Sequence, residues 1–180
     1  AVTFDPVLPG ADLPAVGSGL RWAPPPRGRV PRDETAIAFA PLGPLHEWLR
    51  RRKLTSAALT DLYLGRLRQF GPGLECVVTL TEDLAREQAT AAAEAIRRGR
   101  MRGPLHGIPY GLKDLFDTKG IPTTWGAEPY QGRVPPRDAA VVKRLAEAGA
   151  VLCAKLTLGA LAYGDVWFGG RTRNPWNRKE

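Results

Sequence analysis

The order of elements between residues 108 and 155 constrains the fold of this chain more than any other feature. Residues 108–114 predict a short strand, and Asp138 is placed to cap a helix over residues 139–148. The apolar run AVLCAKL, which ends at Leu156, predicts a second and buried strand. A strand, a helix and another strand in this order form a right-handed crossover between parallel neighbours. The sequence therefore predicts an α/β fold.

Helices and one further strand are predicted before this unit. A short helix spans residues 44–52, and a longer one runs from its N-cap Ser56 to the Gly71-Pro72 pair. A strand over residues 76–80 follows, and Thr81 is predicted to cap the next helix, which ends before Gly99. In the helix over residues 139–148, we expect Val141, Val142 and Leu145 to face the core.

Two regions divide the chain. Residues 1–36 are rich in proline and glycine and are expected to form an extended leader, because proline disfavours helix and removes a backbone donor. Residues 37–180 are expected to form the α/β domain. No apolar run is long enough to span a membrane. The compartment stays open between the cytoplasm and export, since a signal peptide could have preceded Ala1.

The formal net charge of +8 and the isoelectric point near 10.0 raise the question of an anionic partner. The cations gather in two clusters, residues 50–53 and 97–102, both at the ends of predicted helices. Cations there stabilise the helix dipole, so solvated helix ends are the preferred interpretation. A nucleic-acid or membrane footprint is the alternative, but no aromatic residues are interleaved with the clusters. Nucleic acid is therefore not expected as a partner.

Few residues suggest a metal, cofactor or thiol site. Cys76 and Cys153 lie in apolar runs and are predicted to be buried and reduced, with a disulfide or a reactive cysteine as the alternatives. The two histidines have no metal-site spacing, and neither a phosphate loop nor a G-x-G-x-x-G motif is present. We expect neither a metal nor a cofactor.

Lys113 is the strongest candidate for chemistry. It lies in PYGLKD, where alternation places Lys113 with Pro109 and Gly111 on one face of the strand. Burial would lower its pKa from about 10.4 towards 7–8, where an amine can act as a base. A structural ion pair with Asp114 or another carboxylate is the alternative, and spacing alone does not decide between them.

Three longer segments carry a family resemblance. They are GPLHGIPYGLKDLFDTKGIPTTWGAEPY at residues 103–130, RDAAVVKRLAEAGAVLCAKLTLGALAYG at 137–164 and FGGRTRNPWN at 168–177. Together they resemble the amidase signature family over residues 42–180. The resemblance implies the N-terminal part of an α/β fold whose mixed sheet is covered by helices.

The resemblance also implies a serine–serine–lysine triad in which Lys113 is the lysine. In such enzymes a neutral lysine acts through a bridging serine on a nucleophilic serine, and an acyl-enzyme forms. Tyr163 falls in the stretch that lines the substrate channel in relatives, so it is a candidate substrate-binding residue. Where many members read G-K-T-N, this chain reads Ala154-Lys155-Leu156-Thr157, which affects details of the acyl pocket.

The two serines of the triad are missing from these 180 residues. The family places them in a Gly/Ser-rich segment after the N-P-W motif, and Ser18 and Ser56, the only serines, match neither position. We therefore expect an amidase that hydrolyses a small carboxamide, with this chain supplying only the lysine and being inactive alone. The rest of the domain, or a complementing chain, would supply the serines.

Two other functions remain open. One is the A subunit of a tRNA-dependent amidotransferase, although the Pro-rich leader argues mildly against it. The other is a non-catalytic scaffold or binding protein derived from the family, for which the missing serines are direct support.

Overall fold

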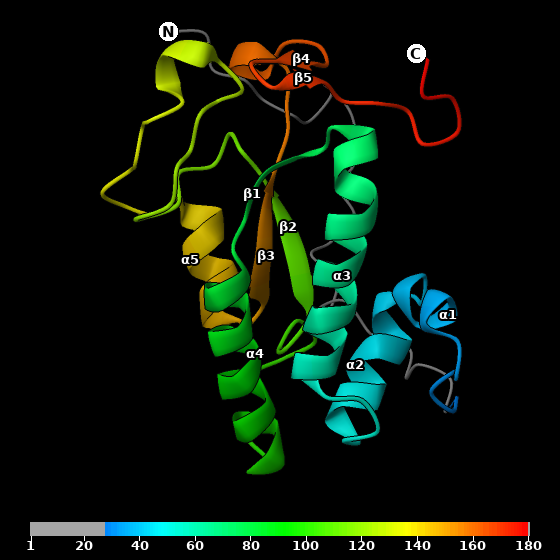
Figure 1. The fold of residues 1–180 in the computed structure, drawn as a ribbon. Coiled ribbons are helices and arrows are strands. Elements are labelled where there is room, and N and C mark those ends of the chain that lie inside the picture. Colours follow the sequence, from blue (N-terminus) through cyan, green and yellow to red (C-terminus); the bar gives the residue numbers. More distant parts are fainter. Residues whose placement is uncertain (1–27, 180) are drawn as a thin grey trace, which may run out of the picture.

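A computed structural model describes residues 28–179 of the chain (Figure 1). Most of the predicted leader, residues 1–27, lies outside the described part. The helices and strands, in chain order, are α1 (Glu34–Ala38), α2 (Leu42–Arg50), α3 (Ser56–Leu74), β1 (Val77–Leu80), α4 (Glu82–Arg97), β2 (Pro109–Lys113), α5 (Ala140–Glu147), β3 (Val151–Leu156), β4 (Val166–Trp167) and β5 (Gly170–Arg171). Two short 3₁₀ helices, η1 (Glu128–Tyr130) and η2 (Ala160–Ala162), complete the order.

The main sheet has the strand order β1-β3-β2. Strand β2 runs parallel to β3, as the strand–helix–strand pattern predicts, and β1 runs antiparallel to it. The α/β fold and its mixed sheet are therefore confirmed. Strands β4 and β5 form a separate antiparallel pair beyond the end of β3.

Helices cover both faces of the main sheet (Figure 1). On one face, Leu64 of α3 and the small residues Ala85 and Ala89 of α4 pack against Val151 and Cys153 of β3. On the other face, Val142 of α5 packs against Leu112 and Leu152. The small alanine side chains allow α4 to approach β3 closely. No helix in residues 28–179 is long and apolar enough to cross a membrane.

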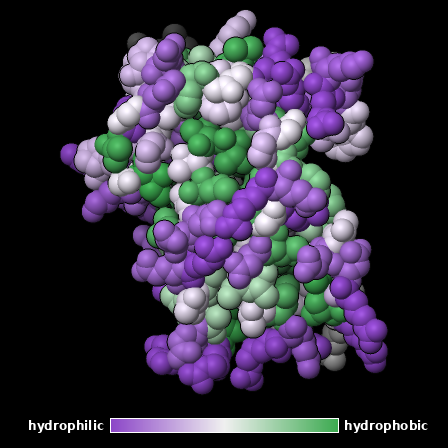
Figure 2. Space-filling view, in the orientation of Figure 1, coloured by the Kyte–Doolittle hydropathy of each residue, from purple (hydrophilic) through white to green (hydrophobic). Residues whose placement is uncertain are grey.

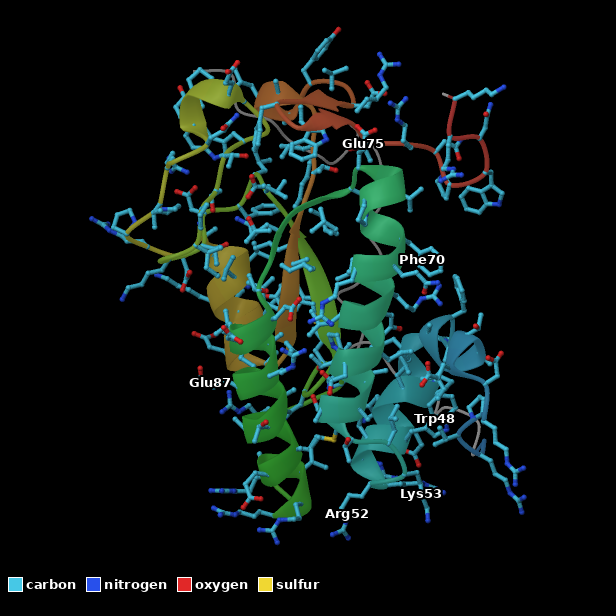
Figure 3. The ribbon with its side chains drawn as sticks, in the orientation of Figure 1. Trp48, Arg52, Lys53, Phe70, Glu75 and Glu87 are labelled. Carbon is cyan, nitrogen blue, oxygen red and sulfur yellow. The ribbon has the colours of Figure 1, made fainter. Side chains whose placement is uncertain are left out.

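A second core joins the N-terminal helices to the start of β2. It contains Leu49 of α2, Leu59 of α3, Ile96 of α4 and Ile108, which immediately precedes β2. Trp48 is also buried there, and its indole Nε1 donates a hydrogen bond to the carbonyl of Gly28 at 3.1 Å. This core fixes the ends of α2 and α4 relative to each other (Figure 3).

The predicted N-cap of α3 is wrong by one residue. Thr55 is the N-cap, and its Oγ1 accepts a hydrogen bond from the amide of Ala58 at 3.1 Å. Ser56 is fully buried instead, and its hydroxyl donates to the carbonyl of Gly107 at 2.8 Å. Both residue types can cap a helix, so the choice depends on the partner that tertiary packing offers to Ser56.

Helix α5 also departs from its predicted cap. Its N-cap is Ala139, while the Asp138 carboxylate accepts a hydrogen bond from the amide of Lys119 at 2.6 Å. Of the expected inward residues, Val142 is buried and Leu145 half-buried, but Val141 is exposed. The cap is lost because a loop distant in sequence binds the carboxylate.

Two other boundaries shift for local reasons, and one predicted cap forms its side-chain hydrogen bond elsewhere. Residues predicted to be extended up to position 36 include the start of α1, which the Asp33 carboxylate caps through the amides of Thr35 and Ala36. Helix α3 continues past Pro72 and ends where Glu75 adopts a left-handed conformation. Thr81 is the N-cap of α4, but its hydroxyl donates to the carbonyl of Leu152 instead of capping the helix.

His106 is buried where the segment before β2 meets the end of α5. Its Nδ1 accepts a hydrogen bond from the amide of Arg102 at 2.8 Å, and Gly149 lies against the ring. Burial, with a smaller contribution from the Arg102 charge, lowers the pKa of His106. The folded state therefore favours the neutral imidazole.

We predict that stability falls as the pH drops below about 6.5, the ordinary pKa of histidine. Below that value the unfolded chain binds a proton that folded His106 resists, so the free energy of unfolding decreases until the folded pKa is passed. In His106→Asn the amide oxygen replaces Nδ1 as acceptor and cannot titrate. Urea unfolding at pH 7.5 and 5.5 should show a smaller loss in this variant, and an unchanged loss would contradict the assignment.

Candidate active site

Lys113 is the last residue of β2, at the carboxyl end of the parallel pair. It is exposed, and within residues 28–179 its side chain makes no hydrogen bond or ion pair. The desolvation that the sequence predicts for Lys113 is thus not found in the described part of the chain. The physical reason is that β2 is an edge strand of the main sheet there, with β3 as its only neighbour.

An apolar cavity of about 250 Å³ lies on the same side of β2 as Lys113. Tyr63 and Leu67 of α3 line one side, and Gly111 and Leu156 line the other. A Cβ atom on Gly111 would lie 2.5 Å from the Leu156 side chain, so glycine is what lets Leu156 lie across β2. Alternation along β2 places the Lys113 side chain beside this cavity.

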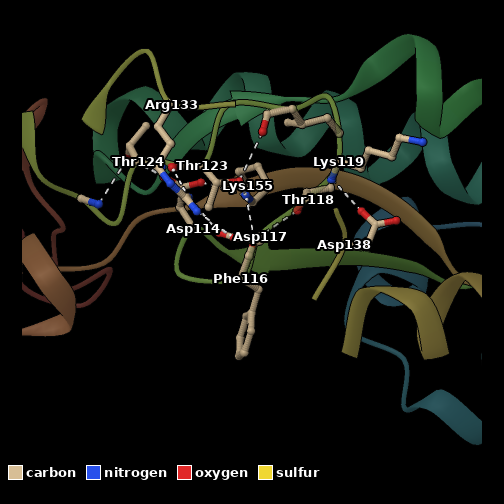
Figure 4. A network of polar contacts seen from close by, with 12 residues as sticks. Asp114, Phe116, Asp117, Thr118, Lys119, Thr123, Thr124, Arg133, Asp138 and Lys155 are labelled. Atoms are coloured by element: carbon tan, nitrogen blue, oxygen red, sulfur yellow. Dashed lines mark hydrogen bonds and ion pairs between the residues drawn. The ribbon is translucent and has the colours of Figure 1, made fainter. Parts of the chain in front are cut away.

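The lysine that is buried is Lys155, at the end of β3 (Figure 4). Its Nζ lies 2.9 Å from Oδ1 of Asp114, and neither side chain has any exposed surface. Besides this ion pair, the ammonium donates hydrogen bonds to the Thr123 hydroxyl at 2.6 Å and to the Phe116 carbonyl at 3.2 Å. Asp114 is therefore paired with Lys155, not with Lys113.

Burial lowers the pKa of Lys155, while Asp114 acts in the opposite direction by stabilising the ammonium. The other oxygen of Asp114 accepts hydrogen bonds from the amide and the hydroxyl of Thr124. A buried charge is tolerated only when it is paired and hydrogen-bonded, and both members of this pair meet that condition.

A register shift in the sheet separates the two lysines. Pairing between β2 and β3 shifts between Tyr110 and Gly111, so Leu112 lies opposite Lys155 and Lys113 lies opposite Leu156. Without the shift the two lysines would lie opposite each other, where like charges destabilise a sheet. With it they point to opposite faces, one buried and one exposed.

Backbone hydrogen bonds on both sides of Lys113 fix its position. The amide of Asp114 donates to the Leu156 carbonyl at 2.8 Å, and the Lys113 carbonyl accepts from the amide of Phe116 at 3.1 Å. The Asp114 side chain is paired with Lys155 and hydrogen-bonded to Thr124. Both the backbone and the side chain of Asp114 are therefore fixed, and with them the position of Lys113 next to it.

The loop after β2 is held by a second ion pair. Arg133 donates two hydrogen bonds to the Asp117 carboxylate, each at 2.8 Å, and one to the Thr123 carbonyl at 3.2 Å. Its guanidinium also lies over the Trp125 ring, 4.0 Å from the centroid. The hydrogen bonds from Arg133 lower the pKa of Asp117. This network keeps Thr123 in place as a partner of Lys155 (Figure 4).

Tyr163, the candidate substrate-binding residue, is 89% exposed and follows η2. It lies in the segment after β3, which leaves the sheet at the same end as Lys113, but no hydrogen bond joins the two side chains in residues 28–179. Several large apolar residues near that end are exposed as well, namely Phe116, Leu161, Val166 and Phe168.

Neither cysteine nor Ser56 offers a nucleophile. Both cysteines are free, and burial raises the pKa of Cys153 to about 12 and that of Cys76 in the same direction. The thiolate is thus disfavoured at both positions. Ser56 is buried and donates its hydroxyl to a backbone carbonyl, while Ser18 lies outside the described residues. Residues 28–179 also contain no cluster of His, Cys, Asp and Glu that could hold a metal ion.

Comparisons with known proteins show the family of the chain. The sequence model of the family described as Amidase matches residues 58–180. The chain belongs to this family, the amidase signature family. The A subunit of a glutamyl-tRNA(Gln) amidotransferase from Dehalococcoides mccartyi is 43% identical over 135 residues, and that from Methylococcus capsulatus is 40% identical over 139 residues. These alignments cover 73% and 76% of this chain.

Solved structures show the same fold. The peptide amidase from Stenotrophomonas maltophilia superposes with a TM-score of 0.72 at 35% identity, covering 79% of this chain and 31% of the enzyme. A fatty acid amide hydrolase superposes with a TM-score of 0.76 over 83% of this chain and 27% of its own, but at 24% identity this likeness shows the fold alone. The chain spans 28% of the length of both amidotransferase subunits.

Sequence reasoning singled out Lys113 and missed the Asp114–Lys155 pair. A signal for it was present, because Lys155 lies in the apolar run AVLCAKL, as an isolated lysine in a strand predicted to be buried. A buried lysine requires a carboxylate, and Asp114 was available at the end of the neighbouring strand. The register that joins them was not readable from the pattern.

We predict that Lys155→Met, which leaves the Asp114 carboxylate buried without a partner, lowers the free energy of unfolding by about 3–5 kcal/mol. Asp114→Asn should also be strongly destabilising, since it leaves the ammonium without its counter-ion. The double variant Asp114→Asn/Lys155→Met should recover much of the loss, because neither charge remains. Urea denaturation of the four proteins measures the coupling, and additive losses would show that the two residues do not act as a pair.

Proposed function

We propose that this chain is the lysine-bearing N-terminal part of an amidase, which hydrolyses a small carboxamide to an acid and ammonia or an amine. The observation that carries the proposal is the family match over residues 58–180. The motif resemblance assigns the role of the family's catalytic lysine to Lys113 within this range. The buried Asp114–Lys155 pair supports it, because it holds the backbone next to Lys113 in a fixed position.

In the proposed mechanism Lys113 is the proton carrier. The neutral amine receives the proton of the nucleophilic serine through a bridging serine, and the serine oxygen attacks the amide carbon. The proton is then delivered to the nitrogen of the leaving group as the C–N bond breaks and an acyl-enzyme forms. Water, activated in the same way, hydrolyses the acyl-enzyme and regenerates the serine. Both serines come from outside these 180 residues.

Exposed groups at the carboxyl end of β2 and β3 support completion by further protein. Lys113 lies on an edge strand, beside an apolar cavity. Large apolar side chains are also exposed near that end, including Leu161, Tyr163 and Phe168. Contiguous exposed apolar surface usually marks an interaction site. Covering this surface would supply the desolvation that Lys113 needs to act as a base, and it would place Tyr163 beside the substrate.

A chimera tests the proposal. In the peptide amidase from Stenotrophomonas maltophilia, the matched segment is replaced by residues 28–179 of this chain. We predict that the 180-residue chain alone releases no ammonia from a peptide amide, whereas the chimera does. Lys113→Met in the chimera should lower kcat/KM by about 10²–10⁴-fold, the usual contribution of a general acid–base group.

Lys119→Met is the matched control, because Lys119 is an exposed lysine in the loop that follows β2. It should leave kcat/KM within about twofold, as expected for a surface residue. Full activity of the chimera with Lys113→Met would refute the catalytic role of Lys113. Ammonia release by the isolated chain would refute the need for further protein.

A second function is favoured by the relatives of highest identity given above, which are named as A subunits of an amidotransferase. In that case the amide cleaved is glutamine, and the ammonia passes to a partner protein. We predict that a chimera with the A subunit from Dehalococcoides mccartyi, assembled with its partner proteins, then hydrolyses glutamine and loses this activity on Lys113→Met. If only the peptide amidase chimera is active, the hydrolase is favoured. If folded chimeras of both kinds are inactive, the chain is better described as a non-catalytic scaffold.

A further inference from the structure

The fold brings the two arginine-rich segments, residues 50–53 and 97–102, to one end of the molecule. Leu49 and Leu54 flank the first segment, and Ile96 and Met101 lie beside and within the second. All four pack into the same core cluster. In Figure 3, Arg52 and Lys53 lie at the lower end of the view, where α4 also ends. We call residues 50–53 and 97–102 the basic end.

The basic end holds eight of the 26 lysines and arginines of the chain and few carboxylates. Its cations are Arg50, Arg51, Arg52, Lys53, Arg97, Arg98, Arg100 and Arg102. Glu47 pairs with Arg50 and Arg51, and Glu94 pairs with Arg97 and Arg98. Two carboxylates therefore face eight cations, which leaves an excess of six positive charges, compared with a net charge of +8 for the whole chain.

Three of these cations make neither an ion pair nor a side-chain hydrogen bond within residues 28–179. They are Arg52, Lys53 and Arg100, and all three are exposed. Arg102 also has no acidic partner in this range, but its guanidinium donates hydrogen bonds to the carbonyls of Ala146 and Glu147 at the end of α5. The dipoles of α2 and α4 need cations only in their last turns, so the three unpaired cations exceed what helix stabilisation requires.

The surroundings of the basic end distinguish between classes of anionic partner. No large apolar side chain of residues 45–60 or 94–106 is among the exposed ones, so there is nothing there to insert into a lipid bilayer. Hydrophilic residues also dominate this end in Figure 2. The absence of an exposed aromatic residue from these two ranges leaves no platform on which unpaired bases could stack. Arginine in place of lysine favours phosphate, which the guanidinium binds through two parallel hydrogen bonds.

We propose that the basic end binds the phosphate backbone of double-stranded nucleic acid, without reading its sequence. Arg52, Lys53 and Arg100 contact phosphates, and the arginines paired to Glu47 and Glu94 add to the positive field. This surface does not depend on the proposed amidase site. Ile108 packs in the core beneath the basic end at the start of β2, whereas Lys113 is at the other end of that strand.

The proposal is tested by fluorescence anisotropy, in which the full chain is titrated into labelled RNA or DNA duplexes of about 20 base pairs. The titrations are repeated at about 50–200 mM NaCl, a range over which binding through phosphate contacts weakens strongly with salt. The variant Arg52→Glu/Lys53→Glu/Arg100→Glu removes the three contacts. The control Lys119→Glu/Arg137→Glu/Lys179→Glu changes three exposed cations elsewhere and has the same net charge. The two duplex types show whether one helix form is preferred.

For the wild-type chain we expect binding that weakens steeply with salt. In the basic-end variant Kd should rise at least about tenfold, and the slope of log K against log salt should fall by about three. The control should change Kd by less than about threefold, as expected for a weaker general-charge effect. A milder set, Arg52→Gln/Lys53→Gln/Arg100→Gln, should give an intermediate loss if the charge-reversed variant fails to fold by circular dichroism.

Several results would overturn the proposal. They are no binding at the lowest salt, equal losses in the two charge-reversed variants, and tighter binding to phosphatidylcholine/phosphatidylserine vesicles than to either duplex. Displacement of the duplex by polyglutamate at equal charge concentration would assign the surface to an acidic protein partner instead.

Discussion

The ion pair between Lys155 and Asp114 is the interaction on which the arrangement of this site depends. It joins the ends of two parallel strands with no exposed surface on either side chain. Its remaining hydrogen bonds extend to Thr123, Thr124 and the Phe116 carbonyl, so the loop after β2 is built around it. Such a pair adds little net stability over a well-packed apolar core, but breaking one partner is severely destabilising. Its role is therefore to specify one arrangement of the loop.

That arrangement explains how two lysines in one small sheet have different environments. The register shift between β2 and β3 places Lys155 opposite Leu112 and leaves Lys113 opposite Leu156. Gly111 makes the shift compatible with packing, because Leu156 occupies the space that a side chain would need. One lysine thereby supports the loop, and the other is presented at the edge of the sheet.

The two ends of the molecule differ in chemistry. At the carboxyl end of the parallel strands, an exposed lysine and large apolar residues lie on an open sheet edge. At the opposite end, the core shared by α2, α3 and α4 gathers cations from two distant segments. We propose that the first surface contacts further protein around a reaction centre, and that the second contacts phosphate. Because they lie at opposite ends of β2, one chain can carry both.

Local patterns in the sequence determined most of the elements of this protein. Apolar periodicity marked the helices and strands, the strand–helix–strand order fixed the parallel pair, and the long motifs around Lys113 identified the amidase family. These features could be predicted because they depend on neighbours in the chain. Caps such as Ser56 and Asp138 could not, since each side chain found a partner distant in sequence.

Only the tertiary structure decided which lysine is buried, which carboxylate it meets and where the basic clusters lie. The sequence made Lys113 the candidate for a desolvated amine or a partner of Asp114, yet Lys155 took both properties. A one-residue shift in strand register reverses the face of every side chain beyond it. Such a shift, like the packing that joins α2 to α4, is set by contacts between distant segments, which sequence spacing does not record.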